Sequence, residues 1–340
     1  MNPSATGYGR QGLGSDPRQF GISHTRADNS MTNNVHGNSN TNCANVSSSY
    51  NNNTINIGTN EELLRIQEWL SPLEPGRRHR GVRNRRLDGI GDWVLRTDEF
   101  VSWCKSRDDS DDRALRCYGG QGVGKTYIRY ENAFQELSTM LTTKKISSLV
   151  IDTLCEQARG QNIAVLYLYC DYQAQKDQSA VNMIGGLLKQ VAIGAIGGPG
   201  GIKRAFKEST QGGGQSLRLP EMLKLFAEMI SSIELVYICV DAIDELLPHD
   251  RSEFLRALRQ IIQDAPNMRL FLTGRPYIRG ELDKHLTKGG YIIYIVVDQG
   301  DITRYLNRKM NDDDDRDPDL MTESLKNDIM EAMLEKASEM

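Results

Sequence analysis

Residues 114–126 read ALRCYGGQGVGKT, a short apolar run that leads into the pattern G-x-x-x-x-G-K-[ST]. Such a loop needs glycines because its backbone must turn tightly and direct several N–H groups at one anion. Its lysine reaches the β- and γ-phosphates of a nucleotide, and the hydroxyl after it is a ligand for Mg²⁺, which makes Thr126 a candidate metal ligand. The stretch predicts a strand followed by a phosphate-binding loop with the residues Gly119, Gly120, Gln121, Gly122, Val123, Gly124, Lys125 and Thr126.

A second motif lies in the stretch ELVYICVDAIDEL, residues 234–246. Its apolar half predicts a buried strand, and Asp241 stands at the carboxyl end of that strand, where ligands bind in open α/β sheets. A carboxylate in this place holds magnesium, and a following acid can polarise the attacking water. Asp241 is therefore a second candidate metal ligand, and Asp244 and Glu245 are candidate catalytic acids. The alternative for each is a helix-capping or exposed turn carboxylate.

A third motif, MRLFLTGRP at residues 268–276, predicts another buried strand with polar side chains at its end. Thr273 can contact the γ-phosphate, and Arg275 can stabilise charge that develops during phosphoryl transfer. The alternative is a capping threonine and a surface arginine. Three nucleotide-binding elements in this order, each at the end of a strand, indicate a P-loop NTPase core.

Between residues 114 and 297 helical segments alternate with the apolar runs ALRCYG, IAVLYLYCDY, ELVYICVDAI, MRLFLTG and YIIYIVV. Such alternation predicts a parallel sheet with helices on both faces, an α/β fold with the three-layer αβα arrangement of P-loop NTPases. We expect a helical pre-domain element and basic linker at 60–113, the NTPase core at 114–300, and the start of a helical region at 301–340.

The N-terminal segment, residues 1–59, is poor in aliphatic side chains and rich in Asn, Ser and Gly. It cannot bury enough surface to offset chain entropy, so we expect it to be disordered. Its last residues, INIG at 55–58, resemble the core of amyloid-forming signalling motifs, and Asn-dense segments can stack as cross-β ladders. The alternative to amyloid-like self-assembly is an Asn-rich linker.

The run PGRRHRGVRNRR, residues 75–86, carries seven basic side chains. Three interpretations are open: a solvated connector, a nuclear-import or nucleic-acid patch, or a source of positive charge for the phosphates of a nucleotide. No aromatic side chains interleave for base stacking, which favours the connector over a nucleic-acid patch.

The bulk composition points to a protein of the cytoplasm. A formal net charge of −4 gives no reason to expect nucleic acid or an anionic membrane as a partner. No window approaches the roughly 20 apolar residues of a membrane helix, and the polar N-terminus has no apolar core for a signal peptide. The six cysteines show no metal-binding spacing, so buried reduced thiols are expected.

Taken together, GGQGVGKT, DAIDEL and LTGRP resemble the NACHT family of signal-transduction NTPases, in the branch common in filamentous and mushroom-forming fungi. The resemblance begins at IQEWLSP and continues through LYLYCDY to DITRYLNRKM, so it covers about residues 62–340. It implies an NTP-driven switch of the STAND class that binds ATP or GTP with Mg²⁺ and oligomerises through its NTPase core. It also implies a role in intracellular signalling of the innate-immunity type, such as self/non-self recognition or programmed cell death.

The same resemblance implies roles for individual positions. The end of the glycine-rich loop corresponds to Walker A, and DAIDE at residues 241–245 corresponds to Walker B. Arg275 corresponds to the sensor arginine. The turn GIGDW at residues 89–93 resembles the pre-domain element of the family, which implies a position near the nucleotide base.

Two departures from the family pattern bear on function. The sequence shows no internal repeats, so we expect a member truncated before the C-terminal repeats. In the family, G-K-T is followed at once by a helix that reads roughly T-x-I-S-S-L-V-I-D-x-L, but here TYI at 126–128 and SSLVIDTL at 147–154 are separated by the 18 residues 129–146. We expect this segment to be an insertion, such as an in-frame retained intron or a mis-predicted exon boundary; the alternative is a long helix or helical hairpin.

Three functions remain open from the sequence. The first is a nucleotide-dependent switch with slow hydrolysis that changes oligomeric state. The second is an efficient NTPase of the AAA+ kind, and the third is an interaction module that no longer hydrolyses nucleotide. The preference for ATP or GTP lies in loops that these motifs do not define.

Overall fold

The protein is described by a computed structural model that covers residues 60–105, 113–119, 143–194, 200–211, 216–286, 288–296, 298–311 and scattered positions between 322 and 335. All of these belong to the unit Thr41–Met340. Three parts of the sequence predictions lie outside the described residues: the N-terminal segment 1–59, the loop residues 120–126, and positions 129–142 of the expected insertion.

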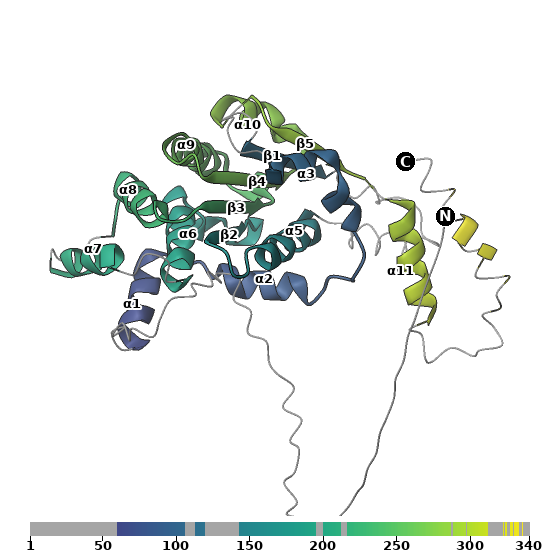
Figure 1. The fold of residues 1–340 in the computed structure, drawn as a ribbon, viewed down its shortest axis with the longest axis horizontal. Helices are drawn as coiled ribbons and strands as arrows, with labels where there is room; N and C mark the ends of the chain where they lie inside the picture. Colours follow the sequence, from purple (N-terminus) through teal and green to yellow (C-terminus); the bar gives the residue numbers. More distant parts are fainter. Residues whose placement is uncertain are drawn as a thin grey trace, which may run out of the picture. The chain divides into compact units, whose positions relative to one another are not determined.

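Five parallel strands form one sheet, in the order β2-β3-β4-β1-β5 (Figure 1). Each strand coincides with one of the five apolar runs of the sequence, and the central strands are buried on both faces, as parallel strands usually are. The α/β prediction is confirmed. The strands are β1 (Ala114–Gly119), β2 (Ile163–Tyr169), β3 (Leu235–Asp241), β4 (Met268–Gly274) and β5 (Tyr291–Ile295).

Helices cover both faces of the sheet and make three layers (Figure 1). One core packs α1 (Asn60–Leu70), α6 (Ala180–Gly194), α7 (Gly200–Gln211), α8 (Leu219–Ile230), α9 (Pro248–Asp264) and α10 (Arg279–His285) on one face. The other core packs α3 (Asp98–Lys105), α5 (Thr143–Gln157) and the 3-10 turn η1 (Asp92–Arg96) on the opposite face. Across the described residues, no helix is long and apolar enough to cross a bilayer.

Alternation along the strands decides which side chains face α5. On β3, Val236, Ile238 and Val240 belong to the first core, whereas Tyr237 and Cys239 belong to the core that contains α5. Because successive side chains of a strand point to opposite faces, Asp241 is on the α5 side as well. The final residue of β3 thus faces the first turns of α5.

The basic run of residues 75–86 is a packed helix for most of its length, which corrects the expectation of a solvated connector. It forms α2 (Pro75–Arg83), with a proline at its start, where a missing N–H costs nothing. The ring of His79 is buried and lies between Tyr169 of β2 and Asp152 of α5, with Nδ1 2.7 Å from the tyrosine hydroxyl and Nε2 3.1 Å from Oδ1 of the carboxylate. One face of α2 is therefore anchored to the core.

The turn at residues 89–93 packs between the start of α5 and helix α11 (Gln299–Asn311) and contacts both. Gly91 has φ of 84°, and a Cβ atom at this position would lie 2.4 Å from Cδ1 of Ile146, so only glycine fits. The N–H of Gly91 donates to Oδ2 of the buried Asp301 at 2.9 Å, and Arg304 donates to the carbonyl of Gly89 at 2.7 Å.

The remaining 3-10 turns are η3 (Tyr172–Asp177), η4 (Ile243–Glu245) and η5 (Pro276–Ile278).

Candidate functional site

The carboxyl ends of β1, β3 and β4 meet at one edge of the sheet. β4 pairs with β1 on one side and with β3 on the other, so Thr273 lies between the end of β1 and Asp241. The strand order also changes direction at β1, which lies between β4 and β5, and ligands bind at such a switch point in open α/β sheets. The structure therefore brings together Gly119, Asp241 and Thr273, which the sequence predicted from three separate motifs.

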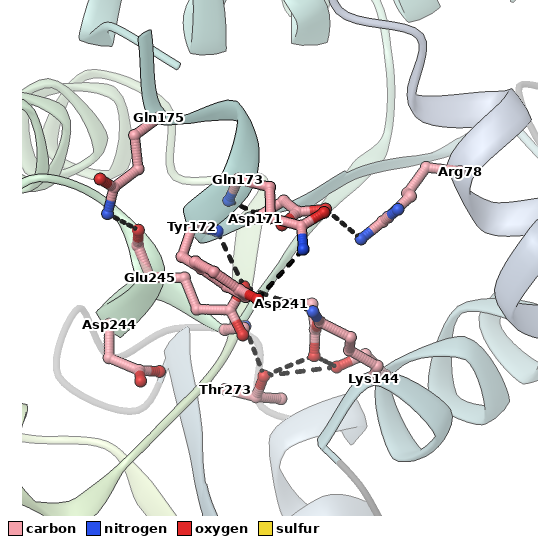
Figure 2. A network of polar contacts seen from close by, with 12 residues as sticks. Arg78, Lys144, Asp171, Tyr172, Gln173, Gln175, Asp241, Asp244, Glu245 and Thr273 are labelled. Atoms are coloured by element: carbon pink, nitrogen blue, oxygen red, sulfur yellow. Dashed lines mark hydrogen bonds and ion pairs between the residues drawn. The ribbon is translucent and has the colours of Figure 1, made fainter. Parts of the chain in front are cut away.

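Asp241 is buried, and its two carboxylate oxygens differ in their surroundings (Figure 2). Oδ1 accepts hydrogen bonds from Oγ of Ser147 at 2.5 Å and from Oγ1 of Thr273 at 2.7 Å. Oδ2 is equally buried and has no hydrogen-bond partner among the described residues. A buried acceptor without a partner is costly and uncommon, so this oxygen suits a bound cation or a water molecule held by one.

The charge of Asp241 is poorly compensated. Burial raises the pKa of its carboxyl to about 6, against an ordinary value of 3.8; the hydrogen bonds from Ser147 and Thr273 and the ammonium of Lys144 lower it, and the carboxylate of Glu245 raises it again. At neutral pH the group is thus ionised at a cost. A hard divalent cation with oxygen ligands, such as Mg²⁺, would supply the missing positive charge, so the residues present fit such an ion.

The backbone after Asp241 turns through a strained residue. Ala242 has φ of 52°, and it is the one residue other than glycine with positive φ within the described ranges. Its N–H donates to Oγ1 of Thr273 at 2.9 Å, and its carbonyl accepts from the N–H of Glu245 at 2.8 Å. Left-handed backbone at such a residue costs on the order of 1 kcal/mol and is concentrated at functional sites. The turn places Glu245 beside the sheet edge.

Ser147 is a site residue that the sequence motifs did not identify. It lies in α5, is fully buried, and its hydroxyl is the closest hydrogen-bond donor to Asp241. The signal for it was weak: two serines, 147 and 148, interrupt an otherwise apolar helix face. A buried hydroxyl needs a partner, and the partner becomes visible only when α5 is placed over β3.

Glu245 is held by two donors. Its Oε2 accepts from Nζ of Lys144 at 3.3 Å and from the backbone N–H of Tyr172 at 3.2 Å (Figure 2). Its own carbonyl accepts from Nε2 of Gln175 at 2.7 Å, which ties η4 to η3. The side chain remains 19% exposed, so solvent and ligands can reach the carboxylate. Lys144 was also missed, because the sequence reading assigned it to the insertion.

Asp244 and Arg275 contact each other. The backbone N–H of Arg275 donates to Oδ1 of Asp244 at 3.2 Å, and its Nε lies 3.4 Å from Oδ2. The carboxylate of Asp244 is 6% exposed, whereas the Arg275 side chain is 47% exposed. The structure therefore places Asp244 as a partner that orients Arg275 at the end of β4.

The position of α5 identifies it as the helix behind the predicted loop. A Cβ atom at Gly119, the end of β1, would lie 2.8 Å from Cγ2 of Thr143, the first residue of α5. The end of β1 and the start of α5 are therefore close together. Residues 120–142, which connect them in the sequence, are outside the described residues. The last four residues of the expected insertion, 143–146, form the first turn of α5, in which Ile146 is buried.

The chain is similar to several solved structures at low sequence identity. A Walker-type ATPase of Pyrococcus abyssi matches with a TM-score of 0.42 and 13% identity over 78% of this chain and 66% of its own. Cdc6p of Pyrobaculum aerophilum matches with a TM-score of 0.35 and 15% identity, over 71% of this chain and 52% of its own. The Aeropyrum pernix ORC1 protein, solved in complex with DNA, matches with a TM-score of 0.36 and 14% identity, over 72% of this chain and 53% of its own. No curated protein matches.

The chain thus spans between about half and two thirds of the length of these solved proteins. The parallel sheet with helices on both faces, the phosphate-loop pattern at the end of β1 and the carboxylate at the end of β3 are those of a three-layer α/β fold of the P-loop NTPase type. A family model described as nephrocystin 3, N-terminal, matches residues 89–275. This match covers more than half of the 340 residues, and the chain therefore belongs to the nephrocystin 3 N-terminal family.

Proposed function

We propose that this chain is a nucleoside-triphosphate-binding molecular switch of the NACHT and STAND type, with Mg²⁺-dependent binding and slow hydrolysis. One observation carries the proposal: Asp241 is buried at the end of β3 with Oδ2 unpartnered among the described residues, at the same sheet edge as the end of β1, where the G-x-x-x-x-G-K-[ST] pattern begins. A buried ionised carboxylate beside a phosphate-binding pattern is suited to a cation that accompanies phosphates.

Each residue has a defined part in this proposal. Lys125 and the loop N–H groups would hold the phosphates, and Thr126 and Asp241 would hold Mg²⁺. The ion would shield the charge of the phosphate oxygens. Thr273 keeps Asp241 in place through its hydroxyl and lies at the same edge, where it can also meet the terminal phosphate. Arg275 is exposed enough to move from Asp244 toward a ligand.

The surroundings of Glu245 support slow hydrolysis. A general base must accept a proton from the attacking water, and it does so best when its carboxylate is not stabilised by other donors. Oε2 of Glu245 already accepts from Lys144 and from the N–H of Tyr172. These two donors occupy the oxygen that would accept this proton, which is compatible with a switch and a disadvantage for a motor.

Nucleotide titration of the full chain tests this proposal. Lys125→Ala and Asp241→Ala are expected to weaken Mg-nucleotide binding by at least ~10-fold, equivalent to about 1.4 kcal/mol. Lys224→Ala removes an exposed lysine on α8 and serves as the matched control, with affinity unchanged. Equal affinity of wild type and both site variants would refute nucleotide binding at this edge. Parallel titrations with ATP and GTP give the base preference.

Two other functions are distinguished by kinetics. An interaction module that no longer hydrolyses is favoured if single-turnover hydrolysis is equally absent in wild type and Glu245→Gln. An AAA+-like enzyme is favoured if steady turnover exceeds about 1 s⁻¹, the lower end of common enzyme rates. A slow wild-type reaction that Glu245→Gln abolishes supports the switch.

The proposal extends to assembly. We infer that the chain acts in the cytoplasm in signalling of the self/non-self or cell-death type, and oligomerises through its NTPase core when nucleotide is bound. Light scattering with and without Mg-nucleotide measures that change in mass.

Amyloid-like assembly of the N-terminal segment is tested by fibril formation of a peptide of residues 30–60, and a peptide that stays soluble and unordered rules it out.

The segment 129–146 and the turn 89–93 belong to the same proposal. If the segment is an insertion, a chain that lacks it binds nucleotide more tightly than the full chain, and RNA sequencing across the junction shows which form predominates.

If the turn lies near the nucleotide base, Trp93 fluorescence changes on binding, whereas an unchanged signal places the base elsewhere.

A further inference from the structure

A cavity of about 730 Å³ lies between α2, the first turn of α5 and the turn η3. Its volume is in the range of small-molecule sites. Neither Asp241 nor Thr273 is among the described residues of its wall, whereas Lys144 belongs to the wall and also contacts Glu245, so the cavity adjoins the nucleotide-binding edge. Its basic lining residues are Arg77, Arg78, Arg85, Lys144 and Lys145.

Helix α2 presents one face to this cavity and uses another to hold itself in place. The wall residues of α2 are at positions 75, 77, 78, 81 and 82, and Glu74 before the helix and Arg85 after it also contribute; positions 74, 77, 78, 81, 82 and 85 have the spacing of one helical face. On the other face, His79 and Arg86 both contact Asp152 of α5, at 3.1 and 2.7 Å. The anchoring face fixes the orientation of the helix, so the residues of the cavity face are pre-positioned.

The wall of the cavity carries an excess of positive charge. It contains five basic side chains and two acidic ones, and both acids are already paired: Glu74 with Lys189 of α6, and Asp171 with Arg78 (Figure 2). Within the described ranges, Arg77 and Arg85 have no ion-pair partner. A negatively charged ligand would therefore meet cations that the protein itself has not neutralised.

The first turn of α5 brings a second basic side chain, Lys145, close to Arg85. Burial lowers the pKa of Lys145, and the positive charge of Arg85 lowers it further, so two like charges are held close together at the cavity. Lys144 reaches both the cavity wall and Glu245. Placing like charges together costs free energy, and a bound polyanion would offset that cost.

The cavity also has an apolar side. Leu73, Val82, Leu168 and Tyr169 contribute to its wall, which distinguishes it from an exposed basic surface for nucleic acid. We propose that this cavity binds a polyphosphorylated small molecule, with its phosphates against the cations of α2 and α5. This site is additional to the proposed nucleotide-binding edge and does not depend on it.

Gly81 offers a variant that alters the cavity without disturbing the fold. A Cβ atom at this position meets nothing within 4 Å, although Gly81 lies in the wall near the middle of α2. Gly81→Glu adds a negative charge directed into the cavity. Gly81→Ala is the matched control, because it changes the same residue, fits the open space and improves helix propensity by roughly 1 kcal/mol.

The test is calorimetric titration of the full chain with tripolyphosphate in four proteins. These are the wild type, Lys125→Ala, and two double variants that combine Lys125→Ala with Gly81→Ala or with Gly81→Glu. The Lys125→Ala substitution weakens the phosphate-loop site, and we expect tripolyphosphate to bind that variant still. Gly81→Glu should weaken this remaining binding by at least ~10-fold, and Gly81→Ala should change affinity less than ~2-fold. Higher salt should weaken it as well, because the attraction is between exposed charges.

The outcomes separate this site from the nucleotide site. Loss of all tripolyphosphate binding in Lys125→Ala, or binding in that background that Gly81→Glu leaves intact, overturns the proposal and leaves the proposed function standing. Binding that Gly81→Glu removes and Lys125→Ala does not supports it whatever the nucleotide result. Titrations with ATP and with inositol hexakisphosphate in the Lys125→Ala background then show whether the phosphates come from a nucleotide or from an inositol phosphate.

Discussion

Substituting Asp241 by asparagine should make the protein more stable at high pH. Asparagine has the shape of the protonated carboxyl group and no charge, and its oxygen can accept the same hydrogen bonds from Ser147 and Thr273. In the wild type, the carboxylate is buried, and Oδ2 has no partner within the described residues. The substitution therefore removes an incompletely compensated buried charge and puts an NH2 group in place of Oδ2, a change whose cost does not vary with pH.

The magnitude follows from the pKa. The pKa of Asp241 is raised from 3.8 to about 6, so between these values the folded state binds the proton more tightly than the unfolded state. The free energy of unfolding must then fall as pH rises through this window, and nearly the full cost is present above about pH 7. A shift of about 2 units corresponds to on the order of 3 kcal/mol.

Urea denaturation of both proteins at about pH 4.5 and about pH 8 measures this cost. The difference in unfolding free energy, asparagine variant minus wild type, should grow by about 2 kcal/mol between the two pH values, since all other groups are shared. The remainder of the ~3 kcal/mol is already present at pH 4.5, which is above the ordinary pKa of 3.8. Asp264→Asn, at the exposed end of α9, is the control and should show a change below about 0.5 kcal/mol. A difference that stays constant across the two pH values would falsify the account of Asp241.

Saturating Mg²⁺ at the higher pH provides an independent check on the same variant. An ion that binds the folded state raises its stability by mass action, so the wild type should gain stability and Asp241→Asn should not. Equal gains in both proteins would show that Mg²⁺ binds elsewhere. This readout needs neither nucleotide nor hydrolysis.

Three further predictions concern the neighbours of this carboxylate. Lys144→Met removes one donor from Glu245 and should increase single-turnover hydrolysis several-fold; an unchanged or slower rate contradicts the explanation of slow turnover. Ser147→Ala should cost about 1–3 kcal/mol in urea denaturation, because it removes the 2.5 Å hydrogen bond to buried Asp241, and a loss below 0.5 kcal/mol would count against that contact. His79→Ala should cost about 3 kcal/mol and increase proteolysis within α2, because it removes the buried anchor of that helix, whereas proteolysis at the wild-type rate would show that α2 docks without it.

The three nucleotide motifs were predictable because each is local. A buried strand followed by a polar residue can be read from about ten positions, so the sequence indicated Asp241 and Thr273 and their places at strand ends. Ser147 and Lys144 were not found. Their importance depends on which side chains lie opposite them, and those side chains are about a hundred positions away in the sequence.

The basic segment shows the same limit. Its composition suggested a solvated connector, and composition alone does not distinguish a connector from a helix with one buried face. The structure separates them through His79, whose ring lies between Tyr169 and Asp152. His79 thus docks α2 against the core, and other residues of the same helix line a cavity.

The sequence by itself determined the five strands, the order of the three motifs along them, and the oxygen-rich character of the site. These depend on hydrophobic periodicity and on residue type, both of which are local properties. Only the tertiary structure decided that β4 lies between β1 and β3, that α5 brings Ser147 and Lys144 to the carboxylates, and that Oδ2 of Asp241 is left without a partner among the described residues. Strand order and helix docking arise from burial of many distant side chains at once, so no short stretch of sequence contains them.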